Sequence, residues 1–140
     1  MTAFDLDRFV AAQEDVYEAA LAELKAGRKQ SHWMWFVFPQ FAGLGRSPTA
    51  RFYAIQSAAE ARAYLAHSLL GPRLRECVEA LLGNRRSSVE AIFGPIDAMK
   101  LKSSMTLFEA VAADATLFAA VLGAFFDGAR DAATLRLLDG

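Results

Sequence analysis

Apolar residues recur at steps of three and four along most of the chain, which is the spacing of one face of an α-helix. Near the N-terminus this pattern predicts a single helix that ends at Gly27. Asp5 is expected to cap its start, and Phe4 is expected to pack against Phe9. The apolar positions of this helix are Leu6, Phe9, Val10, Val16, Tyr17, Leu21 and Leu24.

Capping signals mark the starts and ends of further helices. They fall at Ser47-Pro48, at residues 57–60, at residues 87–90, at Gly94-Pro95 and at Asp114. Strand signals are scarce by comparison. The pattern therefore predicts an all-α fold, a compact bundle of about six to eight helices in which residues 1–140 form a single domain.

Two segments are too apolar to lie on a surface. The helix expected after Asp114 is apolar on nearly every side from Leu117 to Phe126, so it should be central in the core or lie in a subunit interface. Residues 33–38 read Trp-Met-Trp-Phe-Val-Phe and have the length of a buried strand, but no convincing second strand could pair with them. We expect a short, irregular or helical segment, with residues 32–38 buried.

Composition and charge narrow the class of protein. Hydrophobic residues make up 54% of the chain and the formal net charge is -1, so a real core is expected and a broad basic surface for nucleic acid is not. The lone Cys77 cannot form an internal disulfide and is expected to be a buried, inert thiol. No signal-peptide pattern and no membrane-spanning stretch is visible, which predicts a cytoplasmic protein without a membrane partner.

Three polar residues fall inside the apolar arc of the helix that begins at Pro95. They are Asp97, Lys100 and Ser104. Because an unpaired buried charge is costly, these residues should either pair with each other or line a wet pocket. In such a pocket Lys100 would bind an anion, Ser104 would donate a hydrogen bond and Asp97 would orient either. The alternative is that Asp97 serves the helix N-terminus while Lys100 reaches solvent.

The aromatic segment has polar ends. Most of it is expected to be core, but His32 and Gln40 bracket the apolar run with groups that need hydrogen-bond partners. Basic and hydroxyl residues directly precede Trp33. This mixture suits the stacking of a flat ligand ring on Trp33 or Trp35 while a neighbouring cation holds an anion.

Familiar catalytic motifs are absent from the sequence. There is no dinucleotide fingerprint, no phosphate-binding loop and no nucleophile elbow, and two histidines with one cysteine make a zinc site improbable. Neither a metal nor a cofactor is therefore expected. Ser103 and Ser104 would form a nucleophile site only if His32 or Lys100 lay within hydrogen-bond reach. The sequence leaves open whether the protein is an enzyme, and no catalytic residue is assigned.

Two long sequence strings resemble a known family. They are residues 27–40, Gly-Arg-Lys-Gln-Ser-His-Trp-Met-Trp-Phe-Val-Phe-Pro-Gln, and residues 100–108, Lys-Leu-Lys-Ser-Ser-Met-Thr-Leu-Phe. With shorter matches along almost the whole chain, they resemble the bacterial domain-of-unknown-function family 1810, loosely labelled "calpastatin". The resemblance implies a compact all-α fold and no assigned reaction. The family pattern often has a second acidic residue after Asp97, where this chain has Ala98. The label carries little weight, because calpastatins are long disordered inhibitors and this chain is apolar.

The sequence supports two functional hypotheses. The first is a pocket that binds or processes a small anionic or nucleotide-like ligand. Its predicted residues are His32, Trp33, Trp35, Gln40, Asp97, Lys100 and Ser104. The second is a non-catalytic protein–protein interaction or regulatory module, which the aromatic excess and the all-round apolar helix favour. In either case we expect a monomer or a homodimer.

Overall fold

The computed structural model describes residues 4–140. These residues contain ten helices and one isolated β-bridge, which lies between helices. Residues 1–3, where the segment searched for a signal peptide begins, lie outside the described residues. The helices are α1 (Asp7–Gln13), α2 (Tyr17–Ala26), α3 (Met34–Val37), α4 (Pro48–Phe52), α5 (Ala58–Ala66), α6 (Leu70–Leu82), α7 (Val89–Phe93), α8 (Pro95–Val111), α9 (Thr116–Phe126) and α10 (Ala132–Asp139). The all-α prediction is confirmed, but the helices outnumber the predicted six to eight.

The predicted first helix is two helices, because the chain turns after α1. The Val16 N–H donates to the Gln13 carbonyl and closes this turn. Asp5 is not the cap of α1. Leu6 occupies the cap position without a side-chain hydrogen bond, and the Asp5 carbonyl accepts instead from Arg8. The short helices α4 and α7 begin at predicted capping signals. The helices that the pattern did not mark are α10 and α3, and α3 has only four residues, too few for an apolar repeat to show.

Most of the other predicted helix ends are confirmed. Ser47 and Ser57 cap α4 and α5, each accepting from the backbone N–H three residues on. Gly27 and Gly94 end α2 and α7 with φ angles of 75° and 81°, which a residue with a side chain rarely adopts. The cap of α7 is Ser88 rather than Ser87. The capping residues therefore predicted where helices end better than they predicted how many helices there are.

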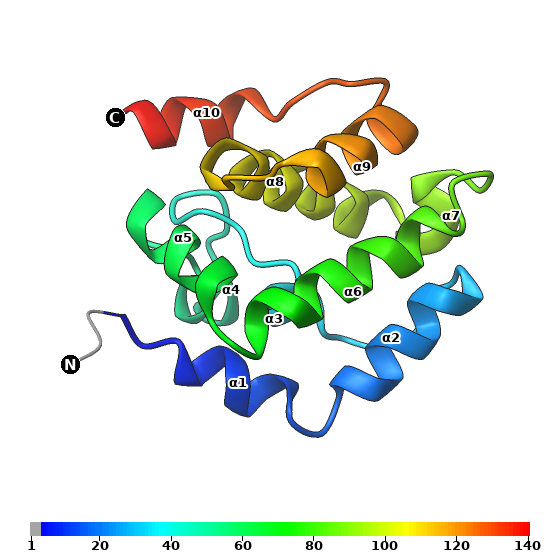
Figure 1. Ribbon diagram of the computed structural model, residues 1–140, viewed down its shortest axis with the longest axis horizontal. Coiled ribbons are helices and arrows are strands. Elements are labelled where there is room, and N and C mark those ends of the chain that lie inside the picture. The colour runs from blue at the N-terminus through cyan, green and yellow to red at the C-terminus, as the bar shows by residue number, and fades with distance from the viewer. Residues whose placement is uncertain (1–3) are drawn as a thin grey trace.

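The long helix α8 lies in the middle of the fold (Figure 1). It packs against α5, α7, α9 and α10, while α6 runs below it in this view and packs against α2, α5 and α9. None of the helices in residues 4–140 is long and apolar enough to cross a membrane. Because α8 is covered on several sides, the few surfaces it leaves open are informative.

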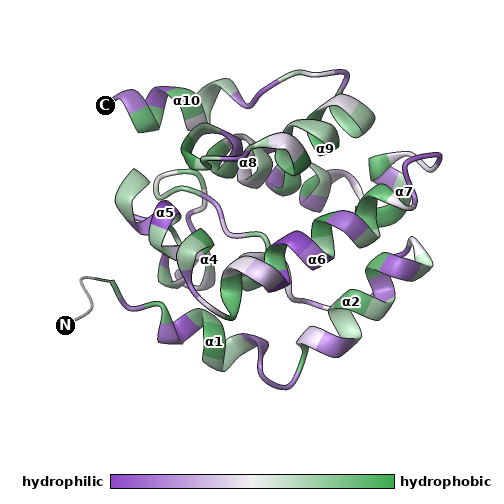
Figure 2. Ribbon diagram, viewed as in Figure 1, coloured by the Kyte–Doolittle hydropathy of each residue, from purple (hydrophilic) through white to green (hydrophobic). Residues whose placement is uncertain are grey.

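The apolar helix α9 is a core helix. Figure 2 shows it hydrophobic along most of its length. Phe118, Val121 and Leu122 are fully buried, and its exposed positions include Gly123 and Ala124, which present little apolar surface. The large exposed hydrophobic side chains of the described residues lie elsewhere. The core reading of this segment therefore accounts for its composition without a subunit interface.

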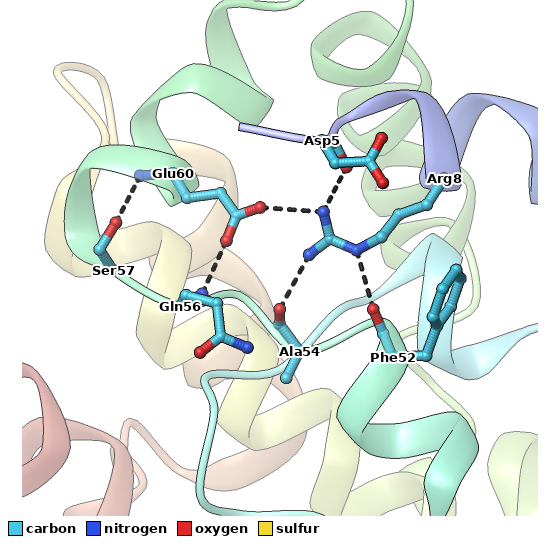
Figure 3. Close-up of polar contacts among 7 residues, drawn as sticks. All are labelled: Asp5, Arg8, Phe52, Ala54, Gln56, Ser57 and Glu60. Atoms are coloured by element: carbon cyan, nitrogen blue, oxygen red, sulfur yellow. Dashed lines mark hydrogen bonds and ion pairs between the residues drawn. The ribbon is translucent and has the colours of Figure 1, made fainter. Parts of the chain in front are cut away.

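A buried ion pair joins α1 to α5, and its two side chains also bind the loop before α5 (Figure 3). One guanidinium nitrogen of Arg8 lies 3.0 Å from a Glu60 carboxylate oxygen, and both side chains are less than a tenth exposed. Arg8 also donates to the carbonyls of Phe52 and Ala54 at 2.8 and 2.9 Å. The other Glu60 oxygen accepts from the Gln56 N–H at 2.7 Å. Charge-assisted hydrogen bonds from Arg8 and Glu60 thus hold the backbone at residues 52, 54 and 56.

The loop that Arg8 and Glu60 hold in turn positions the chain after the aromatic segment. The Ile55 N–H donates to the Gln40 carbonyl at 2.9 Å, and the Ala42 N–H donates to the Ile55 carbonyl at 2.8 Å. These two bonds form the isolated parallel bridge between Phe41 and Ile55. The Gln40 backbone is therefore fixed by the loop around Ile55, a contact that the sequence pattern did not predict.

We predict that Arg8→Met lowers the free energy of unfolding by about 3 kcal/mol or more, because it leaves the Glu60 carboxylate buried without a counter-ion. Arg8→Met combined with Glu60→Gln should recover part of this loss. Urea denaturation measures both variants. Arg51→Met, which changes an exposed arginine in α4, is the control and should stay close to the parent. A loss in Arg8→Met no larger than that of the control would contradict the prediction.

Candidate functional site

The carboxylate of Glu23 holds the start of the aromatic segment. It accepts from the backbone N–H groups of Gln30 and Ser31 at 2.7 and 3.0 Å, from the Ser31 hydroxyl at 2.5 Å and from Trp33 Nε1 at 2.9 Å. Partial desolvation raises the pKa of Glu23, but the hydrogen bonds lower it by more, and the pKa falls from 4.5 to about 2. One ionised side chain on α2 therefore fixes the path of residues 30–33.

Toward its other end, the aromatic segment is held by two buried side chains, Gln13 and Tyr64. The Phe36 carbonyl, at the end of the short helix α3, accepts from Gln13 Nε2 at 2.6 Å and from the Tyr64 hydroxyl at 3.3 Å. Both donors are buried, and burial raises the pKa of Tyr64, so its hydroxyl stays a donor. The prediction of a short helical segment is confirmed by α3. The prediction that residues 32–38 are buried holds for residues 33, 34 and 36–38, but it is wrong for His32, which is exposed, and Trp35 is only partly buried.

Between these two anchors the two tryptophans face different surroundings. Trp33 is 1% exposed and packs edge-on against Phe93, so it belongs to the core. Trp35 is only partly buried and lies beside Lys100, whose ammonium is 4.8 Å from the ring centre. Of the two rings proposed for stacking, Trp35 alone lies at a surface that a ligand can reach.

Two lysines share one carboxylate at the start of α8. Lys29 Nζ lies 2.9 Å from one oxygen of Asp97, and Lys100 Nζ lies 3.5 Å from the other. Lys29 is also tied to the Ser31 carbonyl at 2.5 Å and lies 5.1 Å from the centre of the Trp33 ring. The predicted pairing of Asp97 with Lys100 is present, and the second cation leaves the cluster with a net positive charge.

The cluster lies in a groove made of two adjoining hollows, which share Trp35, Ile96 and Lys100. The inner hollow has a volume of about 370 Å³ and also contacts Lys29, His32 and Asp97. The outer hollow has a volume of about 540 Å³, and its other lining side chains include Gln40, Arg46, Met99, Ser103 and Asp131. The groove runs between one face of α8, the loop before α4 and the start of α10.

The outward face of α8 forms one wall of this groove. Ile96, Met99, Lys100 and Ser103 follow the i, i+3, i+4 and i+7 spacing of one helix face, and all four line the outer hollow. Ile96 and Met99 are 73% and 71% exposed, which is unusual for large apolar side chains. A face that combines apolar, cationic and hydroxyl groups matches the surface of a site for an amphipathic ligand.

The string Ser103-Ser104-Met105-Thr106 mainly fastens α10 to α8. The Ser103 hydroxyl donates to an Asp131 carboxylate oxygen at 3.2 Å, and the Thr106 hydroxyl accepts from the Asp131 N–H at 2.9 Å. The Ser104 hydroxyl is fully buried and has no hydrogen-bond partner among residues 4–140. Much of this distinctive string therefore serves packing between helices.

The structure brings five of the seven predicted site residues to the groove. His32, Trp35, Gln40, Asp97 and Lys100 line it, whereas Trp33 and Ser104 lie in the core. The predicted ligand-binding residues did not include the groove residues Ile96, Met99, Arg46 and Asp131, and Ser103 was named only as a conditional nucleophile. The sequence did hold a signal for Ile96 and Met99. Both are apolar residues that share a helix face with Lys100, so they could have been predicted to contact a ligand there.

The arrangement does not supply an activated nucleophile. The hydrogen-bond partners of the Ser103 hydroxyl are Asp131 and the Met99 carbonyl, and neither His32 nor Lys100 reaches it. In the described part of the chain, no group of three or more histidine, cysteine or acidic side chains is placed to hold a metal ion. What the groove offers is a cation, an aromatic ring and several hydrogen-bonding groups, which together suit binding.

Comparison with known proteins gives a family but no activity. A family model described as "Protein of unknown function (DUF1810)" matches residues 3–138. The crystal structure of the conserved hypothetical protein Rv1873 from Mycobacterium tuberculosis is 51% identical in sequence, with 99% of each chain covered and a TM-score of 0.97. No curated protein matched the sequence.

We predict that Glu23→Gln destabilises the protein by about 1–3 kcal/mol at pH 7, because the neutral amide has one acceptor oxygen in place of two and accepts less strongly than a carboxylate. The pKa of Glu23 is lowered on folding, so its contribution is fully present above about pH 4.5 and is lost as the pH falls towards 2. The difference between parent and variant should therefore shrink over that range. Chemical denaturation at several pH values measures it, with the exposed Glu79→Gln as control. A difference that does not change with pH would disprove this role of the charge.

Proposed function

Since the chain belongs to the DUF1810 family, whose function is unknown, we propose that the groove around Trp35 and Lys100 binds a small anionic ligand that carries a flat ring. The observation that carries this proposal is the pair of lysines on one carboxylate. Asp97 can neutralise only one of the two cations, and the remaining positive charge faces the groove. An anion is the ligand that such a charge favours.

Lys100 is the lysine that would contact the anion. Lys29 is engaged by Asp97 and the Ser31 carbonyl, and its side chain is only 8% exposed. The Lys100 side chain is 25% exposed and lies farther from Asp97. The inner lysine therefore compensates Asp97 and ties the helix start to the aromatic segment, while the outer lysine keeps hydrogen-bond donors for a ligand.

Trp35 would receive the flat part of the ligand. Its ring lines both hollows and is fixed at its base by the hydrogen bonds to α3 described above. A ring stacked on Trp35 would lie close to Lys100, so that one molecule could use both contacts. The outer hollow, at about 540 Å³, falls in the range of about 300–1,000 Å³ that is typical of sites for small molecules.

The proposal is one of binding, and no reaction is assigned to it. A nucleotide or another phosphate-bearing metabolite fits the description, because each joins an anionic group to a larger body. Gln40, at the edge of the outer hollow, offers both a donor and an acceptor to such a ligand. His32 would contribute a further hydrogen-bonding group at the inner hollow.

We predict that a thermal-shift screen with nucleoside phosphates, sugar phosphates and inorganic pyrophosphate finds ligands that raise the Tm of the parent protein. Lys100→Met should weaken the binding of these ligands about tenfold or more, because it keeps the apolar stem of the side chain and removes its charge. Lys102→Met, on the same helix but outside the groove, is the control and should bind as the parent does. The proposal fails if no probe stabilises the parent, or if both variants respond alike.

A second prediction concerns Trp35. Because Trp33 is buried and Trp35 is the partly exposed ring, a ligand in the groove should change the tryptophan fluorescence mainly through Trp35. Titration of the parent with a ligand from the screen should give a saturable change. The same titration of Trp35→Phe should lose most of that signal and show weaker binding by calorimetry. An unchanged signal in Trp35→Phe would place the ligand elsewhere.

One observation favours the second hypothesis, a protein–protein interaction module. Ile96 and Met99 project as large apolar side chains from α8 at the rim of the groove. They would suit a protein partner or a second copy of the chain. Light scattering of the parent and of Ile96→Ser with Met99→Ser separates the two functions. An assembly that the substitutions dissociate supports an interaction surface, and a monomer in both cases opposes self-association.

A further inference from the structure

We propose that Asp131 forms a second contact point in the groove and accepts a hydrogen bond from a hydroxyl group of the ligand sugar. The ligand class would then be a ribonucleotide, with its phosphate at Lys100, its ring at Trp35 and its sugar at Asp131. This inference rests on the proposed function and names the substrate class of the same site. It adds a specificity-determining residue that the sequence pattern did not indicate.

One oxygen of the Asp131 carboxylate is fully used by the fold. Oδ2 accepts from the Ser103 hydroxyl at 3.2 Å, from the Thr134 N–H at 3.0 Å and from the Thr134 hydroxyl at 2.5 Å. The Asp131 N–H is held by Thr106 at 2.9 Å. The side chain is therefore rigidly oriented before any ligand arrives, which lowers the entropic cost of binding.

The other oxygen is not used by the fold. Within residues 4–140, the hydrogen bonds of the Asp131 carboxylate end at Oδ2 and none ends at Oδ1, and the residue lines the outer hollow together with Lys100 and Gln40. The role of Asp131 as the N-cap of α10 needs only Oδ2, and an uncharged asparagine would cap equally well. The capping role, with the helix dipole, accounts for Oδ2 and for a negative charge at this position, and it leaves the second oxygen free for a ligand in the outer hollow.

The charges of the groove set the direction of the ligand. A carboxylate repels a phosphate and accepts from O–H or N–H groups, whereas Lys100 attracts the phosphate. A ligand with an anionic end and a hydroxyl-bearing part matches both. In a nucleotide the sugar is bonded to the ring and to the phosphate, so its hydroxyls are held near both of the other contacts. A phosphate that lacks hydroxyl groups would leave Asp131 without a partner.

The test compares ligands that differ only in the sugar. Calorimetry measures the affinities of the four ribonucleoside 5′-monophosphates and their 2′,3′-dideoxy counterparts for the parent, Asp131→Asn and Lys100→Met. We expect the parent to bind at least one ribo form about tenfold more tightly than its dideoxy counterpart. Asp131→Asn should lose this preference, because the amide that caps α10 through its oxygen presents an N–H₂ group to the groove. Lys100→Met should weaken both forms equally.

The outcomes separate this inference from the proposed function. Binding that depends on Lys100 but is equal for ribo and dideoxy forms overturns the role of Asp131 and leaves the anion site standing. A ribo preference that persists in Asp131→Asn also overturns it. An Asp131→Asn variant that weakens both forms equally assigns the contact to the ring and overturns the sugar assignment. Absence of binding by every nucleotide overturns the ribonucleotide class, and the screen with other phosphates then decides the proposed function separately. The dideoxynucleotides remove the hydroxyl groups from the ligand and leave the protein unchanged. The parent protein alone therefore tests the preference for a ribose.

Discussion

The hydrogen bonds that Glu23 makes to residues 30–33 are the interaction on which the rest of the site depends. The chain between α2 and α3 is not helical, so the backbone N–H groups of Gln30 and Ser31 have no helix carbonyl as a partner. One ionised carboxylate supplies these partners and also holds the indole N–H of Trp33. With Trp33 drawn into the core, Trp35 two residues later is left at the surface of the groove. The burial of the Trp33 ring thus leaves the Trp35 ring accessible to a ligand.

Local rules predicted the fold class because most elements obey them. Serine caps, glycine stops and the Gly94-Pro95 junction mark real helix ends. The number of helices was not predictable in the same way, since the break between α1 and α2 follows a turn at Gln13, whose side chain is drawn into the core to bond the Phe36 carbonyl. That contact joins residues far apart in the sequence, and no periodicity reports it. The Arg8–Glu60 pair is of the same kind, because a residue read as a helix-capping glutamate proves to be the buried partner of an arginine on another helix.

The site was predictable as far as one helix face could reveal it. Polar residues in the apolar arc of α8 led to Asp97 and Lys100, the polar ends of the aromatic run led to His32 and Gln40, and all four line the groove. Ser104 was misplaced in the groove because the arc is wider than the opening, and the next residue back, Ser103, is the one that faces it. Asp131, which we propose as the sugar contact, could not be indicated in this way, since a helix cap looks the same in the sequence wherever it lies in the fold. Such residues become visible only when tertiary packing brings α10 beside α8.

The unpartnered hydroxyl of Ser104 has a consequence for handling the protein. A buried hydroxyl without a hydrogen bond costs about 1–3 kcal/mol, and no contact of the groove or of the helix packing uses it. The fold therefore operates below its attainable stability at one interior position. Alanine there would remove a single polar atom from a closely packed environment and open almost no void. A protein that carries Ser104→Ala would tolerate destabilising substitutions elsewhere. The position is therefore a suitable starting point for producing weakly stable variants in folded form.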